Sequence, residues 1–264
     1  MRFWTVIFRA AAAVAVAAPL FFTAAKAQPN ALTDGEIQGR ALAQKILAQQ
    51  PAADFTNIGV LNIKDAKSVR SEIPVECKTI VTPTNWQTIY KASWTNHYEI
   101  LRVIHAAGQS DSYFHDTNDP VPILGDVPVL GHLFKSPQKL SGSEIMSSFA
   151  NSDFWLADLG LEFFHWPAQK VLKKEVHRSR GCTVLESTNP DPGTNGYSRV
   201  VSWIDSETLG IVEAYAYDAQ GNLLKDFYPK DFKKVDGQWQ VQTLVMENVQ
   251  TGSRSRLEFG LKKD

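Results

Sequence analysis

The chain has 264 residues, of which 44% are hydrophobic and 21% charged, and its formal net charge is −1 at pH 7. An intrinsically disordered chain would have fewer apolar residues and a larger net charge, so this class is excluded. A nearly neutral chain has no global attraction to nucleic acid or to an anionic membrane. We therefore expect a globular protein with a sizeable core and no nucleic-acid partner.

The first 27 residues have the pattern of a secretory signal peptide. Arg2 and Arg9 supply a positive start, residues 10–22 are apolar, and residues 25–27 form an A-x-A cleavage site. The apolar run is too short to favour a membrane span. We expect cleavage after Ala27, export, and one mature domain of residues 28–264. Removing three basic residues and no acid leaves 24 basic against 28 acidic residues, a net charge of −4.

A helical pattern opens the mature chain. Thr33 and Asp34 offer an N-cap, and Pro51 follows the last periodic residue. Between them Ile37, Leu42 and Ile46 recur at helical spacing. The spacing predicts an amphipathic helix of about four turns. Such a helix can pack on a sheet or cover a cavity as a lid, and the sequence leaves both interpretations open.

Residues 54–116 change to a period of two, which is typical of strands with one buried face. Turn residues such as Pro83 and Gly108 separate the alternating stretches. The predicted strands are Phe55–Ile63, Glu72–Thr82, Trp86–Ser93, His97–Ala106 and Ser112–His115.

Residues 116–166 interrupt the strand pattern. The stretch 120–137 is apolar and rich in Pro and Gly, which predicts a loop that dips into the core. After it, Ser152 can cap a helix over residues 153–165 that Pro167 closes. This predicted helix carries a set of large apolar side chains: Phe154, Trp155, Leu159 and Phe163.

The C-terminal part returns to alternation. Asp- and Gly-containing turns as short as Asp236-Gly237 join its strands, so neighbours must run antiparallel. With about nine to eleven strands even before the two within residues 169–187 are counted, a flat open sheet is unfavourable, and we predict a curved or barrel-like one with adjacent strands paired. The predicted strands are Gln169–Arg178, Gly181–Ser187, Ser198–Asp205, Gly210–Asp218, Leu223–Tyr228, Trp239–Val249 and Arg254–Phe259.

Signatures of catalysis or metal binding are weak. His115, Asp116 and Asp119 place three possible ligands within five residues, but structural zinc sites space their ligands more widely, so a solvated loop is favoured. The six histidines match no known catalytic or metal spacing, and no G-x-S-x-G or phosphate-binding loop occurs. We predict a protein without enzymatic activity, cofactor or metal.

Cys77 and Cys182 are the only cysteines, and both fall on predicted strands. In an oxidising compartment an even pair is a candidate disulfide. The alternative is two buried thiols that never meet. We expect the bridge.

Several consecutive motifs point to a family. Residues 149–159, 181–187 and 197–205 resemble, in order and spacing, successive signatures of the outer-membrane lipoprotein-sorting (LolA-like) proteins. The likeness continues through residues 217–221 and residues 235–239, and then 249–254. The resemblance covers about residues 140–260. Each motif alone is common in strand-and-turn proteins, and only their order and spacing together indicate the family.

The resemblance implies a half-open β-barrel of antiparallel strands, with helices covering its concave face and enclosing an apolar cavity. Carriers of this family shield lipoprotein acyl chains across the periplasm without cofactor or catalysis. We therefore expect a periplasmic carrier of lipids or lipoproteins that works with an inner-membrane donor complex and an outer-membrane acceptor. The alternatives are a periplasmic sensor or interaction module that detects mislocalised lipoproteins, and, third, a hydrolase. The residues expected to line the cavity are Ile37, Leu42, Ile46, Phe154, Trp155, Leu159, Phe163, Trp203 and Tyr215.

Overall fold

The computed structural model describes residues 31–106, 108–118, 137–235 and 238–260. The predicted signal peptide, Asp119 and most of the predicted loop 120–137 lie outside these residues. Leu32–Asp264 form one compact unit. Within the described part, no helix is long and apolar enough to span a membrane.

The described residues form a single thirteen-stranded sheet in which every paired neighbour is antiparallel. The elements are α1 (Asp34–Leu47), β1 (Phe55–Lys64), β2 (Arg70–Val81), β3 (Asn85–Trp94), β4 (His97–Ala106), β5 (Ser112–Thr117), β6 (Gln138–Leu140), η2 (Gly142–Met146), α2 (Leu156–Gly160), η3 (Glu162–His165), β7 (Ala168–His177), β8 (Arg180–Thr188), β9 (Arg199–Asp205), β10 (Ile211–Tyr217), β11 (Leu223–Val235), β12 (Gln238–Asn248) and β13 (Ser253–Phe259).

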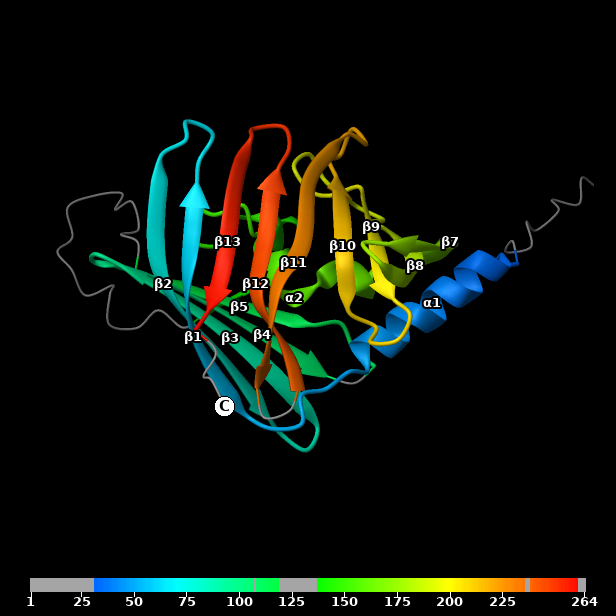
Figure 1. The fold of residues 1–264 in the computed structure, drawn as a ribbon, viewed down its shortest axis with the longest axis horizontal. Coiled ribbons are helices and arrows are strands. Elements are labelled where there is room, and N and C mark those ends of the chain that lie inside the picture. Colours follow the sequence, from blue (N-terminus) through cyan, green and yellow to red (C-terminus); the bar gives the residue numbers. More distant parts are fainter. Residues whose placement is uncertain (1–30, 107, 119–136, 236–237, 261–264) are drawn as a thin grey trace, which may run out of the picture. The chain divides into compact units, whose positions relative to one another are not determined.

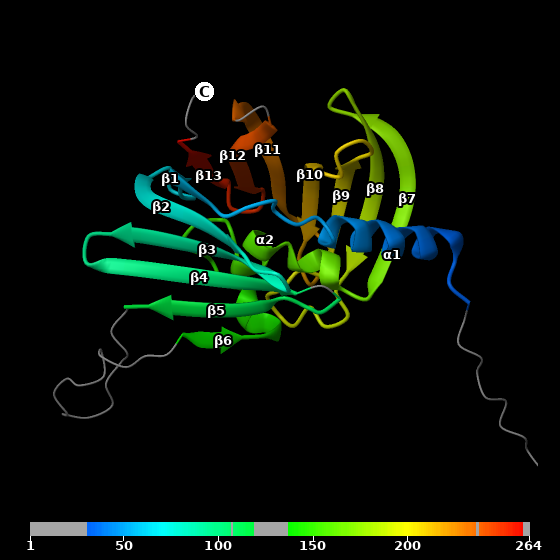
Figure 2. The same ribbon diagram turned by 90° about the horizontal axis from the view of Figure 1, so that it is seen from below.

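Two meanders make up the sheet. Its order is β6-β5-β4-β3-β2-β1-β13-β12-β11-β10-β9-β8-β7, so each strand pairs with its sequence neighbour except where β1 meets β13. The meander of β7 to β13 can be followed in Figure 1, and the sheet stays open because β6 and β7 end it without pairing to each other (Figure 2). The predicted curved, half-open antiparallel barrel is confirmed. Only β6 among the thirteen described strands was not predicted, because its three residues are too few to show an alternating pattern.

Helix α1 begins at a capping box. The Thr33 hydroxyl accepts from the Glu36 N–H, and the Glu36 carboxylate accepts from the Thr33 N–H at 2.7 Å. Two glycines then let the helix approach β7 closely: a Cβ on Gly39 would lie 2.5 Å from backbone atoms of Gln169. The helix therefore covers the open edge of the sheet at β7, which protects unpaired backbone groups from other chains.

The concave face is filled by residues 147–166, here called the plug segment (Figure 2). The helix predicted over residues 153–165 is shorter than expected. It begins after Trp155, and it ends at Leu161, which adopts a left-handed φ of 55° before the short turn η3. Ser152 does not cap it, because the helix begins three residues later, after Trp155; the Ser152 hydroxyl instead donates to the Phe149 carbonyl at 2.6 Å. The plug segment is thus a compact irregular chain rather than one long lid helix.

Two apolar clusters hold the plug segment against the sheet. The first joins the inner faces of β1 to β5 and β13 to Phe149, Phe154 and Leu156. The second joins α1 and the inner faces of β8 to β10 to Phe163 and Phe164. Most of the plug segment is therefore buried between the two clusters, and it forms the centre of the core.

Candidate binding site

The described residues enclose a small void between the plug segment and the sheet. Its volume is about 10 Å³, enough for one water molecule and far too small for an acyl chain. This void is far smaller than the apolar cavity that the resemblance implies. The residues around the void are Asp158, Leu161, Phe163, Val200, Ala214, Ala216, Phe227 and Met246.

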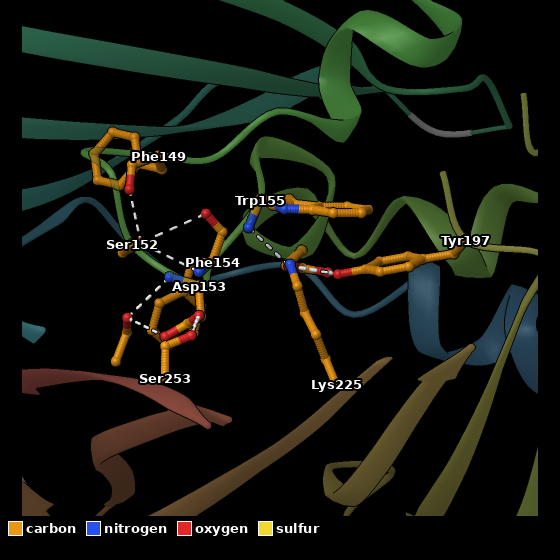
Figure 3. A network of polar contacts seen from close by, with 10 residues as sticks. Phe149, Ser152, Asp153, Phe154, Trp155, Tyr197, Lys225 and Ser253 are labelled. Carbon is orange, nitrogen blue, oxygen red and sulfur yellow. Dashed lines mark hydrogen bonds and ion pairs between the residues drawn. The ribbon is translucent and has the colours of Figure 1, made fainter. Parts of the chain in front are cut away.

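A buried ion pair borders this void. Lys225 on β11 points inward, its side chain is 1% exposed, and its Nζ lies 3.5 Å from the Asp158 carboxylate of the plug segment (Figure 3). The same Nζ lies 3.7 Å from the centre of the Trp155 ring, which stacks on Tyr197. The Tyr197 hydroxyl donates to both Asp158 oxygens at 3.0 Å. A cation, two aromatic rings and a carboxylate thus meet inside an otherwise apolar interior.

Burial shifts the acid–base equilibria of this group. It lowers the pKa of Lys225 to about 8, and the negative charges of Asp158 and Asp153 oppose that shift. Burial raises the pKa of Asp158, against the effect of the Lys225 charge and of hydrogen bonds from Trp155 and Tyr197. Lys225 therefore keeps its proton at neutral pH and requires a negative partner in a medium of low polarity.

Further polar contacts fix the plug segment. Asp153 accepts from the hydroxyls of Ser253 and Ser255 on β13, and Ser255 accepts from the Asp153 N–H at 2.8 Å. The Ala150 N–H donates to Glu99 on β4 at 2.7 Å. At the far end, the buried Gln169 side chain donates to backbone carbonyls of the segment, including Phe163 at 2.9 Å. These contacts tie the segment to both halves of the sheet.

A second, open hollow of about 330 Å³ lies at the other half of the sheet. Its walls are mostly polar, and the His115 ring nitrogen lies 2.9 Å from Glu99 within it. Among the described residues, no group of three possible ligands is placed to hold a metal ion. The lining residues are Trp94, His97, Glu99, His115, Thr117, Ser147, Ser148 and Asn151.

Most of the side chains predicted to line the cavity lie in the interior. Phe154 is 1% exposed and Phe163 is 5% exposed, both within the plug segment. The others that reach the core are Leu42 and Ile46 on α1, together with Trp155 and Leu159. Ile37 does not belong with them, because it lies on the solvent side of α1 and is 54% exposed. Its prediction as a lining residue is wrong.

Trp203 and Tyr215 are also wrongly predicted. Val200 and Ile204 of β9 face the second apolar cluster, and successive side chains of a strand point to opposite faces. Trp203 therefore faces outward, where it stacks on His177 and donates to Glu175 at 2.7 Å. Tyr215 packs edge-on against Trp203 on that same outer face.

The predicted disulfide is wrong as well. Cys77 on β2 and Cys182 on β8 are both buried and free. Six strands separate β2 from β8 in the sheet, so their backbones are not neighbours. Burial raises the pKa of the Cys77 thiol to about 12, which keeps it protonated and inert.

The charged residues of the interior were missed from the sequence. Lys225 lies two residues before Phe227 on β11, and the period of two of a strand puts the lysine on the same, apolar face as Phe227. That position is the one signal that could have identified Lys225. Nothing local marks Asp158 or Tyr197, because their roles depend on contacts across 39 and 67 residues of sequence.

Comparisons with known proteins were made at the level of sequence and of structure. A family model described as "Uncharacterized protein" matches residues 133–261, just under half of the chain. No curated protein sequence matches the chain. Sequence comparison alone therefore leaves the N-terminal half unassigned.

Solved structures cover more of the chain. A DUF1329 family protein from Desulfovibrio piger is 19% identical, with 86% of this chain and 92% of that one covered and a TM-score of 0.66. An outer membrane lipoprotein-sorting protein domain from Vibrio parahaemolyticus is 20% identical, with coverages of 85% and 91% and a TM-score of 0.65. A LolA superfamily protein from Nitrosomonas europaea is 15% identical, with coverages of 88% and 96% and a TM-score of 0.55. The chain therefore has the LolA-like fold, and the resemblance predicted from its sequence is confirmed at the level of the fold.

Proposed function

We propose that this protein is a periplasmic carrier that binds acyl chains of lipids or lipoproteins in its concave interior, without catalysis. The observation that carries the proposal is the construction of that interior. The inner side chains of β9 to β12 include Val200, Ala214, Phe227 and Met246, and an irregular segment covers them instead of a second sheet. The fold shared with the Vibrio parahaemolyticus lipoprotein-sorting domain supports the same function.

In this proposal an acyl chain takes the place of part of the plug segment. Each buried CH₂ contributes about 0.8 kcal/mol, so a twelve-carbon chain contributes roughly 9 kcal/mol before any costs. The chain must displace side chains such as Phe154 and Phe163, whose lost burial costs about 1.5–3 kcal/mol each, and polar contacts, whose loss costs about 1 kcal/mol each. Displacement of the whole segment would cost more than the chain contributes, so only part of it moves. This opposition keeps binding reversible, as a carrier between an inner-membrane donor and an outer-membrane acceptor requires.

A second candidate is a periplasmic interaction module of the same fold. The filled interior favours it, because a void of about 10 Å³ offers no preformed space for a ligand. In that case the plug segment is permanent core, and the protein acts through its surface.

Titration with a dansylated fatty acid at neutral pH separates the two candidates. The carrier predicts saturable binding to the wild type with a blue-shifted emission. Phe163→Ala removes a large side chain from the plug segment, which weakens the closed state and leaves room, so we expect tighter binding by several-fold. Tyr215→Ala is the matched control, because it removes an aromatic ring from the outer face, and its affinity should stay within about twofold of the wild type.

Circular dichroism should first show that all three proteins are folded. A folded wild type without saturable probe binding contradicts the carrier and favours the interaction module. Binding that responds to Tyr215→Ala and not to Phe163→Ala would place the ligand on the outer face and overturn the interior site.

A further inference from the structure

The Asp158 carboxylate occupies a receptor built for an anion. Its donors are the Tyr197 hydroxyl, the Lys225 ammonium and the backbone N–H of Trp155 at 2.8 Å. Tyr197 and Lys225 do not belong to the plug segment, since one precedes β9 and the other lies on β11. If the plug segment moves, these two donors stay with the sheet while the carboxylate leaves.

We propose that Lys225 and Tyr197 bind the anionic end group of the ligand, a carboxylate or phosphate on an acyl chain, and that Asp158 takes the place of this group in the closed state. This inference rests on the proposed carrier function and deepens it, because it names the chemical class of the ligand. The plug segment then acts as an internal competitor for the ligand site.

The need for a negative charge follows from the burial of Lys225. Its side chain is 1% exposed, and its charge is matched in the closed state by Asp158, with Trp155 beneath it. Both partners lie in the plug segment, so its displacement leaves a cation in an apolar interior. A neutral lipid would leave that cation unpaired, whereas an anionic end group restores the pair. Sites with buried polar groups reject ligands that cannot satisfy them.

Lys225 lies beside the void, where it can bind the end group of an acyl chain whose tail extends along the apolar wall. Lys225 pairs across the sheet with Ala216 and stands two residues before Phe227, and both of these line the void. The Ser202 hydroxyl is buried without a hydrogen-bond partner among the described residues, on the strand position that pairs with Ala214. It offers a further donor to ligand oxygens inside the same half of the sheet.

The test compares ligands that share a twelve-carbon chain and differ at one end: dodecanoate, dodecyl phosphate and dodecanol. Affinities are measured at pH 7, where Lys225 with a pKa of about 8 is protonated, by displacement of a neutral fluorescent lipid probe from the full mature protein. We expect the wild type to bind dodecanoate or dodecyl phosphate at least tenfold more tightly than dodecanol. The ratio between the two anions shows whether a carboxylate or a phosphate fits better.

Two variants remove the charge from the receptor. Lys225→Met should bind dodecanol and dodecanoate equally. The double variant Asp158→Leu/Lys225→Met removes both charges together, so it stays folded if the single variant does not, and it should show the same loss of preference. A third variant, Asp158→Asn, removes the competing charge and should tighten dodecanoate binding more than dodecanol binding.

The outcomes separate this inference from the carrier function. Wild type that binds all three ligands with equal affinity, or variants without Lys225 that still prefer the anions, would overturn the anionic receptor and leave the carrier standing. Wild type that binds none of the three ligands would overturn the carrier and, with it, the receptor.

Discussion

Lys225 is the residue on which the interior of this protein depends most. A buried charge is tolerated only with a partner, and Asp158, 3.5 Å away, has that role. The surrounding Trp155 and Tyr197 rings add cation–π contacts and exclude water. The four side chains should therefore respond to mutation as one unit rather than independently.

Replacing only one residue of the Lys225–Asp158 pair is predicted to destabilise the protein strongly, whereas replacing both is not. Lys225→Met leaves the Asp158 charge buried and should lower the free energy of unfolding by about 3–5 kcal/mol. Asp158→Leu/Lys225→Met should lie within about 1 kcal/mol of the wild type or above it. Urea denaturation of the three proteins measures both effects. Equal losses in the single and double variants would show that packing, and not charge, decides the stability.

Stability should also rise with pH because of Lys225. Its pKa is about 8 in the folded protein and 10.5 as the ordinary value, so between these pH values the unfolded chain binds more protons. The free energy of unfolding therefore increases as pH rises through this window. Relative to the double variant, the wild type should gain about 1 kcal/mol between pH 8 and pH 9. Thermal or urea unfolding at both pH values checks this, and a constant difference would contradict the depressed pKa.

For individual residues, the sequence predicted correctly which face of the sheet a side chain points to only where apolar and polar residues alternate clearly. Trp203 and Tyr215 are among the residues expected to line the cavity, yet the register of β9 and β10 sends both outward. Lys225 was overlooked because lysine is almost never fully buried without a partner, and its partner is 67 residues away.

The glycines of α1 determine how this element sits on the sheet. A Cβ at Gly39 would lie 2.5 Å from backbone atoms of Gln169 and Lys170, and one at Gly35 would lie 2.9 Å from the Val171 carbonyl oxygen. Real Cβ atoms do not approach backbone this closely, and backbone within a strand cannot move aside. The helix can therefore lie against β7 only with glycine at these positions.

Gly39→Ala is predicted to destabilise the protein although alanine favours helices. The gain in helix propensity is about 1 kcal/mol, whereas overpacking against fixed backbone costs up to about 3 kcal/mol, so a net loss of about 2 kcal/mol is expected. Gly181→Ala is the control, because a Cβ there meets no atom within 4 Å, and it should change stability by less than about 0.5 kcal/mol. Thermal unfolding compares them. A Gly39→Ala variant as stable as the wild type would refute the close helix–strand contact.

The sequence was sufficient to predict helix α1 and the long strands, but it did not predict the length of the helix in the plug segment. The periodic signals of α1 and of the long strands are local, so the predicted Phe55–Ile63 and the observed Phe55–Lys64 nearly coincide. The predicted helix of residues 153–165 failed because Leu161 adopts a left-handed conformation that tertiary packing enforces. Pro229 within β11 hid the second half of that strand, which continues past a bulge to Val235.

At the scale of the whole molecule, one long-range contact converts two meanders into one sheet. Residues 59–64 of β1 pair with residues 254–259 of β13, close to the two ends of the described chain. Hairpin signals predict each meander, but no local signal predicts this junction. The curvature was predictable from strand number, whereas the filling of the interior by residues 147–166 depends on that curvature.

The central claim is that an acyl chain binds inside this sheet, where the plug segment now lies. Photoaffinity labelling with a diazirine-bearing fatty acid, mapped by mass spectrometry, tests it most directly, because neighbouring residues of one strand face opposite sides. The account predicts saturable labelling of inner residues such as Ala214, Ala216 and Met246. Saturable labelling of the outer Trp203 and Tyr215, or no saturable labelling at all, would contradict it.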